Sequence, residues 1–245
     1  MQDVTRQIGS NISQLTREFE LITHNIANAD TSGFKRRTNA FTAALEAQQD
    51  RANGETSGLV DLHESLDFTP GPFQKTDNPL DLALNGSGFF VIEDTNQVLY
   101  TRAGDFNTNR NGQLVDSQGR LVAGTTGPIT IPPGTELARI NVQADGTVSS
   151  PEHPMLGRLQ LVDFGSVNEQ QLVPMGDCTY VAPNGINPEP ATDVEVVQGA
   201  REGSNVQTIE ELVGMINVTR MYEAHVKFIT ARQEASQSLM SVAMG

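Results

Sequence analysis

Side chains that could act as nucleophiles or bind metals are few in this 245-residue chain and are spread along it. The four histidines are His24, His63, His153 and His225, and no two are four residues apart, as two metal ligands on one helix face would be. Cys178 is the only cysteine, which excludes an internal disulfide and a thiolate-rich metal site. Neither a G-x-S-x-G turn nor a Cys–His nucleophile pattern occurs. We therefore expect no catalytic residue, no cofactor and no metal.

Two short segments begin like ligand-binding loops but do not complete the pattern. Residues 105–109, DFNTN, start like a calcium loop, yet its sixth and twelfth positions hold Arg110 and Asp116 where Gly and Glu are needed. Residues 86–88, GSG, start like a dinucleotide-binding turn, yet Val91 stands where the third glycine is needed. The sequence predicts ordinary turns between strands at both places.

The charge of the chain limits the partners it can have. It carries 16 Lys and Arg against 30 Asp and Glu, a formal net charge of −14. Phosphate backbones require clustered basic residues, so a nucleic-acid partner is not expected. No stretch approaches about 20 consecutive apolar residues, so we expect no membrane insertion. The one basic run, residues 35–37, is interpreted as complementing the C-terminal dipole of a preceding helix.

The first elements that could position side chains are helices at the two ends of the chain. Apolar residues near the N-terminus are spaced 4, 4, 3, 4, 3 and 4 apart, which predicts a helix with a narrow coiled-coil-like seam. This seam consists of Val4, Ile8, Ile12, Leu15, Phe19, Ile22 and Ile26. The helix should end near residues 28–33, NADTSG, which supply turn formers.

A second helical pattern covers the last 42 residues. Ser204 and Asn205 are candidate caps, and Glu210 and Glu211 suit the first turns. One stripe of this helix holds Leu212, Met215, Tyr222, Val226 and Ile229. Neither seam can be buried by its own helix, so we expect the two terminal helices to pair, within one chain or between chains.

The middle of the chain has a different pattern, with short apolar runs separated by Gly, Pro, Asn and Asp. Strands of four to seven residues are predicted from residue 78 to 199, with tight hairpins at 111–112 and 145–146. The predicted fold class is α+β, with paired terminal helices and a central all-β domain. The predicted domains are an N-terminal helix (1–33), an extended linker (34–77), a β-rich domain (78–199) and a C-terminal helix (200–245).

Four blocks of sequence, in this order, are similar to the axial proteins of the bacterial flagellum, the rod and hook family. They are HNIANADTSGFKRR, NPLDLALNGSGFFVI, VLYTRAGDFNTNRNGQLVDSQGRLVAG and EGSNVQTIEELVGMINVTRMYEAHVKFI. The chain lacks the long extra domains of a hook protein, so the resemblance implies a rod protein. The tail TRMYEAHVKFI is closer to the proximal-rod type than to the distal-rod type.

The resemblance implies a function and a set of partners. The terminal helices would form an inner tube, and copies of the chain would stack with other rod proteins into a helical assembly that transmits torque across the periplasm. Export would use the flagellar type III apparatus, without a cleaved signal peptide. The residues that match the family's motif are Asn25, Asn28, Thr31, Gly33 and Phe34, and they would set the turn out of the tube.

Two other classes of protein remain as alternatives on the residues alone. A β-rich binding domain, such as an adhesin with oligomerising helices, would be distinguished by a secretion signal or calcium loops. An enzyme would need a convergent set of polar side chains, which the spacing does not offer.

Overall fold

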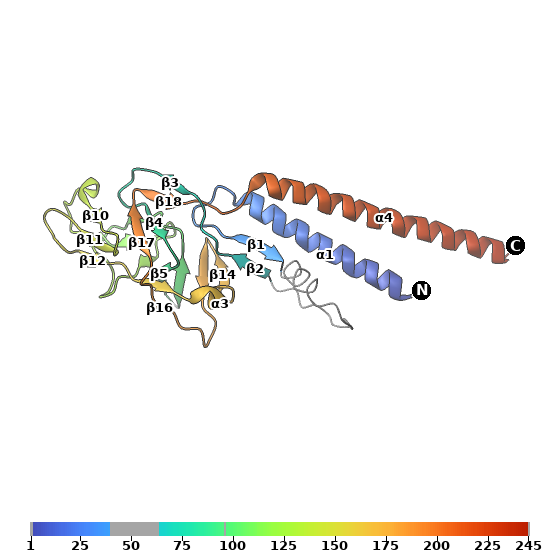
Figure 1. The fold of residues 1–245 in the computed structure, drawn as a ribbon, viewed down its shortest axis with the longest axis horizontal. Coiled ribbons are helices and arrows are strands. Elements are labelled where there is room, and N and C mark those ends of the chain that lie inside the picture. The colour runs from blue at the N-terminus through green and yellow to red at the C-terminus, as the bar shows by residue number, and fades with distance from the viewer. Residues whose placement is uncertain (1, 40–63, 96, 245) are drawn as a thin grey trace. The chain divides into compact units, whose positions relative to one another are not determined.

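The computed structural model describes residues 2–39, 64–95 and 97–244 (Figure 1). The described residues divide between two compact units. Unit 1 comprises Met1–Ala27, Arg37–Glu64 and Val206–Gly245, and unit 2 comprises Asn28–Arg36 and Ser65–Asn205. Part of the predicted linker, residues 40–63, lies outside the described residues, as do the side chains of Val4 and Ile8.

Unit 1 is built on two long helices, α1 (Gln2–Ala27) and α4 (Thr208–Met244). They pack side by side and antiparallel, so that both chain termini lie at the same end of the pair (Figure 1). Apolar residues on α1 lie on one face because their spacing matches the helical repeat, and that face is buried against α4. None of the helices described is both long and apolar enough to cross a membrane.

Unit 2 consists mostly of short strands, as the frequent turn residues predict. The first strands of the chain are β1 (Arg36–Asn39), most of which belongs to unit 1, and then β2 (Glu64–Asp67), β3 (Phe73–Lys75), β4 (Leu82–Asn85), β5 (Phe89–Glu93), β6 (Val98–Thr101), β7 (Asn107–Thr108), β8 (Leu114–Val115) and β9 (Leu121–Val122). A 3-10 turn, η1 (Leu137–Arg139), precedes β10 (Asn141–Val142), β11 (Thr147–Ser149), β12 (Gly157–Arg158) and β13 (Leu161–Asp163). After the short helix α3 (Gly165–Glu169) come β14 (Val173–Gly176), β15 (Thr179–Val181), β16 (Glu189–Pro190), β17 (Glu195–Gln198) and β18 (Ala200–Glu202).

The largest sheet of unit 2 is antiparallel and runs in the order β14-β15-β6-β5-β9-β8-β7, with β13 also paired to β5. Two smaller pairings join the end of the unit to its beginning. Strand β17 pairs with β4, and β18 pairs with β3 so that Glu202 lies opposite Phe73. The last strands before α4 are therefore hydrogen-bonded to strands more than 100 residues earlier in the sequence.

The core of unit 2 lies on both faces of β5, because successive side chains of a strand point to opposite faces. Phe90 and Ile92 belong to one cluster of buried residues, while Phe89 and Val91 belong to the other. All four are almost fully buried. This run of apolar residues, FFVI, is therefore a central strand covered on both faces.

The fold confirms the predicted α+β class, because one long helix precedes the β strands in the sequence and another follows them. The turns at 111–112 and 145–146 are confirmed as hairpins, and Gly112 and Gly146 adopt positive φ there. Residues 86–88 form the turn between β4 and β5, as predicted. Residues 105–109 enter the β7–β8 hairpin rather than a calcium loop.

The structure differs from the predicted boundaries in two places. Unit 2 extends beyond 78–199, because β3 and β18 pair with each other and the chain segment 28–36 packs within the same unit. The last helix begins at Thr208, so Ser204 and Asn205 do not cap it. The prediction that Glu210 and Glu211 occupy its first turn is confirmed.

Candidate functional site

Helix α1 presents its predicted seam to α4 over most of the described length. Ile22 is buried, and Ile12, Leu15 and Ile26 are half-buried. Phe19 remains 41% exposed. The seam therefore has one large aromatic side chain that the helix pair of a single chain does not cover.

The residues of α4 that are buried within one chain lie beside the predicted stripe and overlap it in part. Its buried positions are Glu211 and Val218, and Gly214 lies so close to α1 that a Cβ there would be 3.3 Å from Ile22 Cδ1. Of the predicted stripe, Met215 and Ile229 are half-buried, whereas Leu212, Tyr222 and Val226 are exposed by 46%, 44% and 41%. Apolar residues lie all round this helix, so periodicity alone could not select the face that meets α1.

A groove of about 300 Å³ lies between the two helices. It is lined by Leu15, Thr16, Phe19, Val218, Thr219 and Tyr222. Phe19 and Tyr222 thus lie at one groove, although they come from opposite ends of the sequence. The lining is mainly apolar, and a side chain of another protein could fill it.

The first of the five motif residues, Asn25, acts on the backbone of unit 1. Asn25 is almost fully buried, and its side chain donates to Arg37 O at 2.9 Å and accepts from Arg37 N at 2.9 Å. An amide can make both bonds at once because it carries a donor and an acceptor side by side. The chain after the turn is thereby hydrogen-bonded to the last turns of α1.

The other motif residues form the turn itself, within unit 2. Thr31 Oγ1 donates to Asn28 Oδ1 at 3.2 Å, and the Phe34 ring is buried. Gly33 has φ +68°, and a Cβ at this position would lie 2.3 Å from Ala103 N. Only glycine fits there, because both the dihedral angle and the space exclude a side chain.

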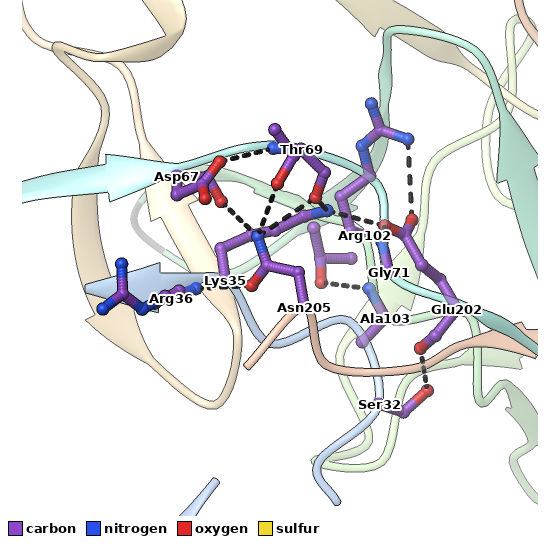
Figure 2. A network of polar contacts seen from close by, with 11 residues as sticks. Ser32, Lys35, Arg36, Asp67, Thr69, Gly71, Arg102, Ala103, Glu202 and Asn205 are labelled. Carbon is purple, nitrogen blue, oxygen red and sulfur yellow. Dashed lines mark hydrogen bonds and ion pairs between the residues drawn. The ribbon is translucent and has the colours of Figure 1, made fainter. Parts of the chain in front are cut away.

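Charged and polar groups around a buried centre form a network, which we call the Lys35–Glu202 network (Figure 2). One of its members, Ser32, belongs to this turn. Its members are Ser32, Lys35, Arg36, Asp67, Thr69, Gly71, Arg102, Glu202 and Asn205. At its centre Lys35 Nζ donates to Glu202 Oε1 at 2.6 Å, and both side chains have 0% exposure. Lys35 Nζ also donates to Thr69 O at 2.8 Å.

A second cation faces the same carboxylate. Arg102 Nη1 lies 3.6 Å from Glu202 Oε2, and the guanidinium is 5.3 Å from the centre of the Phe89 ring. Gly71 N donates to Glu202 Oε1 at 3.1 Å. Burial lowers the pKa of the Lys35 ammonium, and the charge of Glu202 opposes that shift. Two buried cations therefore share one carboxylate in a site that water does not reach.

Asn205 completes the network instead of capping α4. Its Oδ1 accepts from Arg36 N at 2.7 Å, and its Nδ2 donates to Asp67 O at 2.8 Å and Thr69 O at 3.1 Å. The interpretation of the basic run as a helix-dipole partner is wrong for Lys35. Helix α1 ends at Ala27, and the Lys35 ammonium is bonded to Glu202.

Glu202, Arg102 and Val218 were not among the residues predicted to be important. Lys35 and Glu202 are 167 residues apart, and no local pattern links them. The one signal in the sequence was that Lys35 and Glu202 both lie in blocks that resemble the flagellar family. A charged residue that is buried in such a block needs a partner of opposite charge.

The geometry of the network suits structure rather than chemistry. Its central groups, Lys35 and Glu202, are completely buried and bonded to one another. Across residues 2–39, 64–95 and 97–244, no three His, Cys, Asp or Glu side chains are grouped so that they could hold a metal ion. His24 and His225 lie on α1 and α4, His153 lies in a loop, and His63 falls outside the described residues.

Two family models match the chain. The flagellar hook protein FlgE/F/G D1 domain matches residues 83–150, and the C-terminal region of flagellar basal body rod FlgEFG proteins matches residues 197–242. FlgF of Caulobacter vibrioides is 34% identical over 91% of both chains, and FlgF of Salmonella typhimurium is 34% identical over 91% of this chain and 90% of its own. FlgG of Buchnera aphidicola (subsp. Schizaphis graminum) is 31% identical over 89% of this chain and 91% of its own.

The chain belongs to the flagellar basal-body rod protein family of FlgF and FlgG. This family is structural, so the alternatives of an enzyme and of an unrelated binding domain are set aside. Membership places the protein in the basal body of the bacterial flagellum, among other rod proteins.

Proposed function

We propose that this protein is a FlgF-like subunit of the proximal rod, which polymerises through its terminal helices and transmits torque across the periplasm. Its partners are copies of itself and neighbouring rod proteins in a helical assembly. It reaches the rod through the flagellar type III export apparatus, without a cleaved signal peptide.

The exposed apolar surface of α4 is the observation that carries this proposal. Large apolar side chains are exposed along the helix, and they are Ile209, Leu212, Val213, Ile216, Met221, Tyr222, Val226 and Phe228. A helix that is apolar on more than one side is normally buried by neighbours. Only one side of α4 is covered by α1, so contacts with other subunits account for the rest.

In this proposal each predicted domain has a role. Helices α1 and α4 form a coiled-coil-like inner tube, and unit 2, which contains the predicted β-rich domain 78–199, lies outside it. The interface residues are those of the two seams, Val4, Ile8, Ile12, Leu15, Phe19, Ile22, Ile26, Leu212, Met215, Tyr222, Val226 and Ile229. The motif residues Asn25, Asn28, Thr31, Gly33 and Phe34 set the turn out of the tube.

The second candidate is a FlgG-like subunit of the distal rod. It is favoured by the similarity to FlgG of Buchnera aphidicola (subsp. Acyrthosiphon pisum), which at 34% identity equals the similarity to FlgF. The tail around Met221 and Tyr222 favours FlgF, because it departs from the sequence usual in FlgG.

The test is complementation of strains of the source bacterium that lack either FlgF or FlgG. We expect this chain to restore swimming only where FlgF is missing, with complete rods in electron micrographs of purified basal bodies. The Phe19→Asp variant should not restore it, because the new charge would be buried without a partner and would cost several kcal/mol of assembly energy.

The matched control is Ser13→Asp, which adds the same charge at an exposed position of α1. It should swim normally, and circular dichroism should show that both variants keep their β structure. Rescue of the FlgG-deficient strain alone would favour the second candidate. Swimming with Phe19→Asp would contradict assembly through the helical seam.

A further inference from the structure

The chain passes between unit 1 and unit 2 four times, and a member of the Lys35–Glu202 network lies near each passage. The passages fall after residues 27, 36, 64 and 205. Ser32, Lys35 and Arg36 lie between the first two, Asp67 follows the third, and Asn205 is the last residue before the fourth. All these network members belong to unit 2. The segments of unit 2 that lead to the passages, which we call the crossing segments, therefore meet inside unit 2.

The contacts tie these crossing segments to one another, and Arg102, which follows β6 and lies over Phe89, is the network's link to the β core (Figure 2). Lys35 binds the Glu202 carboxylate and Thr69 O, which joins three segments through one ammonium group. Gly33 N and Ser32 Oγ both donate to Glu202 O, at 2.8 and 3.1 Å. Asn205 adds the second link between the 28–36 and 67–69 segments.

A buried ion pair is a weak way to gain stability, because an apolar cluster of the same size is often equally stable. The opening of such a pair is, however, strongly all-or-none. Removal of one partner leaves the other charge buried and unpaired. Burial of the remaining groups then becomes unfavourable. With two cations on one carboxylate, both buried positive charges depend on Glu202.

We propose that the Lys35–Glu202 network is a conformational latch, which holds and releases the crossing segments of unit 2 together while the β core stays folded. When it opens, residues 28–36, 67–71 and 202–205 lose their mutual hydrogen bonds in one step. The latch would let the segments that lead to the terminal helices detach without unfolding the strands around β5.

The test is native-state hydrogen exchange on the purified full-length chain and its Glu202→Gln variant. The reporters are the amides of Gly33, Arg36 and Gly71. In the variant Gly33 keeps its acceptor, the main-chain Glu202 O, and Arg36 keeps Asn205 Oδ1. Faster exchange at these two positions therefore reports opening of the network and not the loss of a single bond.

We expect all three amides to exchange faster by the same factor, at least about tenfold. The amide of Ala123, which donates to Val91 O in the core, should be unchanged. The matched control is Arg120→Gln, which removes a 2.7 Å ion pair with Asp116 elsewhere in unit 2 and should leave the three reporters unchanged.

Acceleration at Gly71 alone would overturn the proposal, and so would equal acceleration of the core. If Glu202→Gln does not fold, the wild-type chain decides. At low denaturant the three amides must then share one opening free energy and one denaturant slope, both below those of Ala123, and separate values would overturn the latch. None of these outcomes depends on the rod assignment, which complementation tests separately.

Discussion

Asp105 shows how the environment of a single carboxylate affects the stability of unit 2. Burial raises the pKa of Asp105 above its ordinary value, with the nearby Asp81 and Asp116 acting in the same direction and Arg201 opposing them. A carboxylate with a raised pKa in the folded state stabilises the fold only at low pH. That contribution is complete below pH 3.8 and is lost as the pH rises through the folded-state pKa.

We therefore predict that Asp105→Asn unfolds at a higher urea concentration than the wild type at pH 7. The amide keeps the shape of the side chain without the buried charge. The advantage should shrink as the pH falls towards 3.8, where Asp105 becomes protonated in both states. Urea titrations at several pH values would measure it.

Asp145 provides a control of opposite sign. Thr147 N and Oγ1 donate to its carboxylate at 3.0 and 2.9 Å, and these bonds lower its pKa. Its contribution is present above pH 3.8 and is lost as the pH falls further, so Asp145→Asn should weaken the protein at pH 7. If both variants moved the midpoint in the same direction, the assigned environments would be wrong.

At the scale of elements, Gly214 lies where α1 and α4 approach each other closely, which limits the size of the side chain at this position. Glycine inside a helix costs about 1 kcal/mol relative to alanine, so its presence at this point requires a reason. A Cβ at this position would lie 3.3 Å from Ile22 Cδ1. Since Cδ1 is the flexible end of the side chain, a methyl group could be accommodated and a larger group could not.

We predict that Gly214→Ala leaves the helix pair intact or stabilises it by up to about 1 kcal/mol. Gly214→Leu should separate the helices and lose most of the burial of Ile22, at about 1–3 kcal/mol. Thermal unfolding, followed by the circular dichroism signal of the helices, would measure the stability of both variants. Gly9→Leu is the control, because a Cβ at Gly9 meets nothing within 4 Å. Leucine is also the better helix former, so Gly9→Leu should not be destabilised. An equal loss of stability in Gly9→Leu would mean that contact with Ile22 does not explain the result.

The elements also differ in how far the sequence predicts them. The end of the first helix and the hairpin at Asp145–Gly146 follow from local residue types, which the structure confirms. The buried face of α4 did not follow, because its apolar residues are not confined to one side. The pairing of Lys35 with Glu202 could not be predicted either, since it depends on how the strands β3 and β18 meet.

The whole molecule carries a net charge of −14, and this charge opposes any association between copies. Salt shortens the distance over which such repulsion acts, from about 30 Å at 0.01 M to about 8 Å at 0.15 M. We predict that the purified protein self-associates more strongly as salt is raised through this range, as measured by sedimentation velocity.

The Phe19→Asp variant separates this effect from unspecific aggregation. It adds one more negative charge and removes the exposed aromatic ring of the helix groove, so it should remain monomeric at both salt concentrations. Association of the variant to the same extent as the wild type would show that the helical seam is not the contact.

The position of Glu202 in the chain has a consequence for how the protein folds. Lys35 emerges early in synthesis, whereas its buried partner lies 167 residues later. Closing so long a loop is entropically costly, and contacts between distant residues slow folding. A nascent chain that ends before β18 has no carboxylate with which to bury Lys35, and β3 has no strand to pair with. Residues 28–36 therefore reach their native place only after nearly five-sixths of the chain, up to Glu202, has left the ribosome.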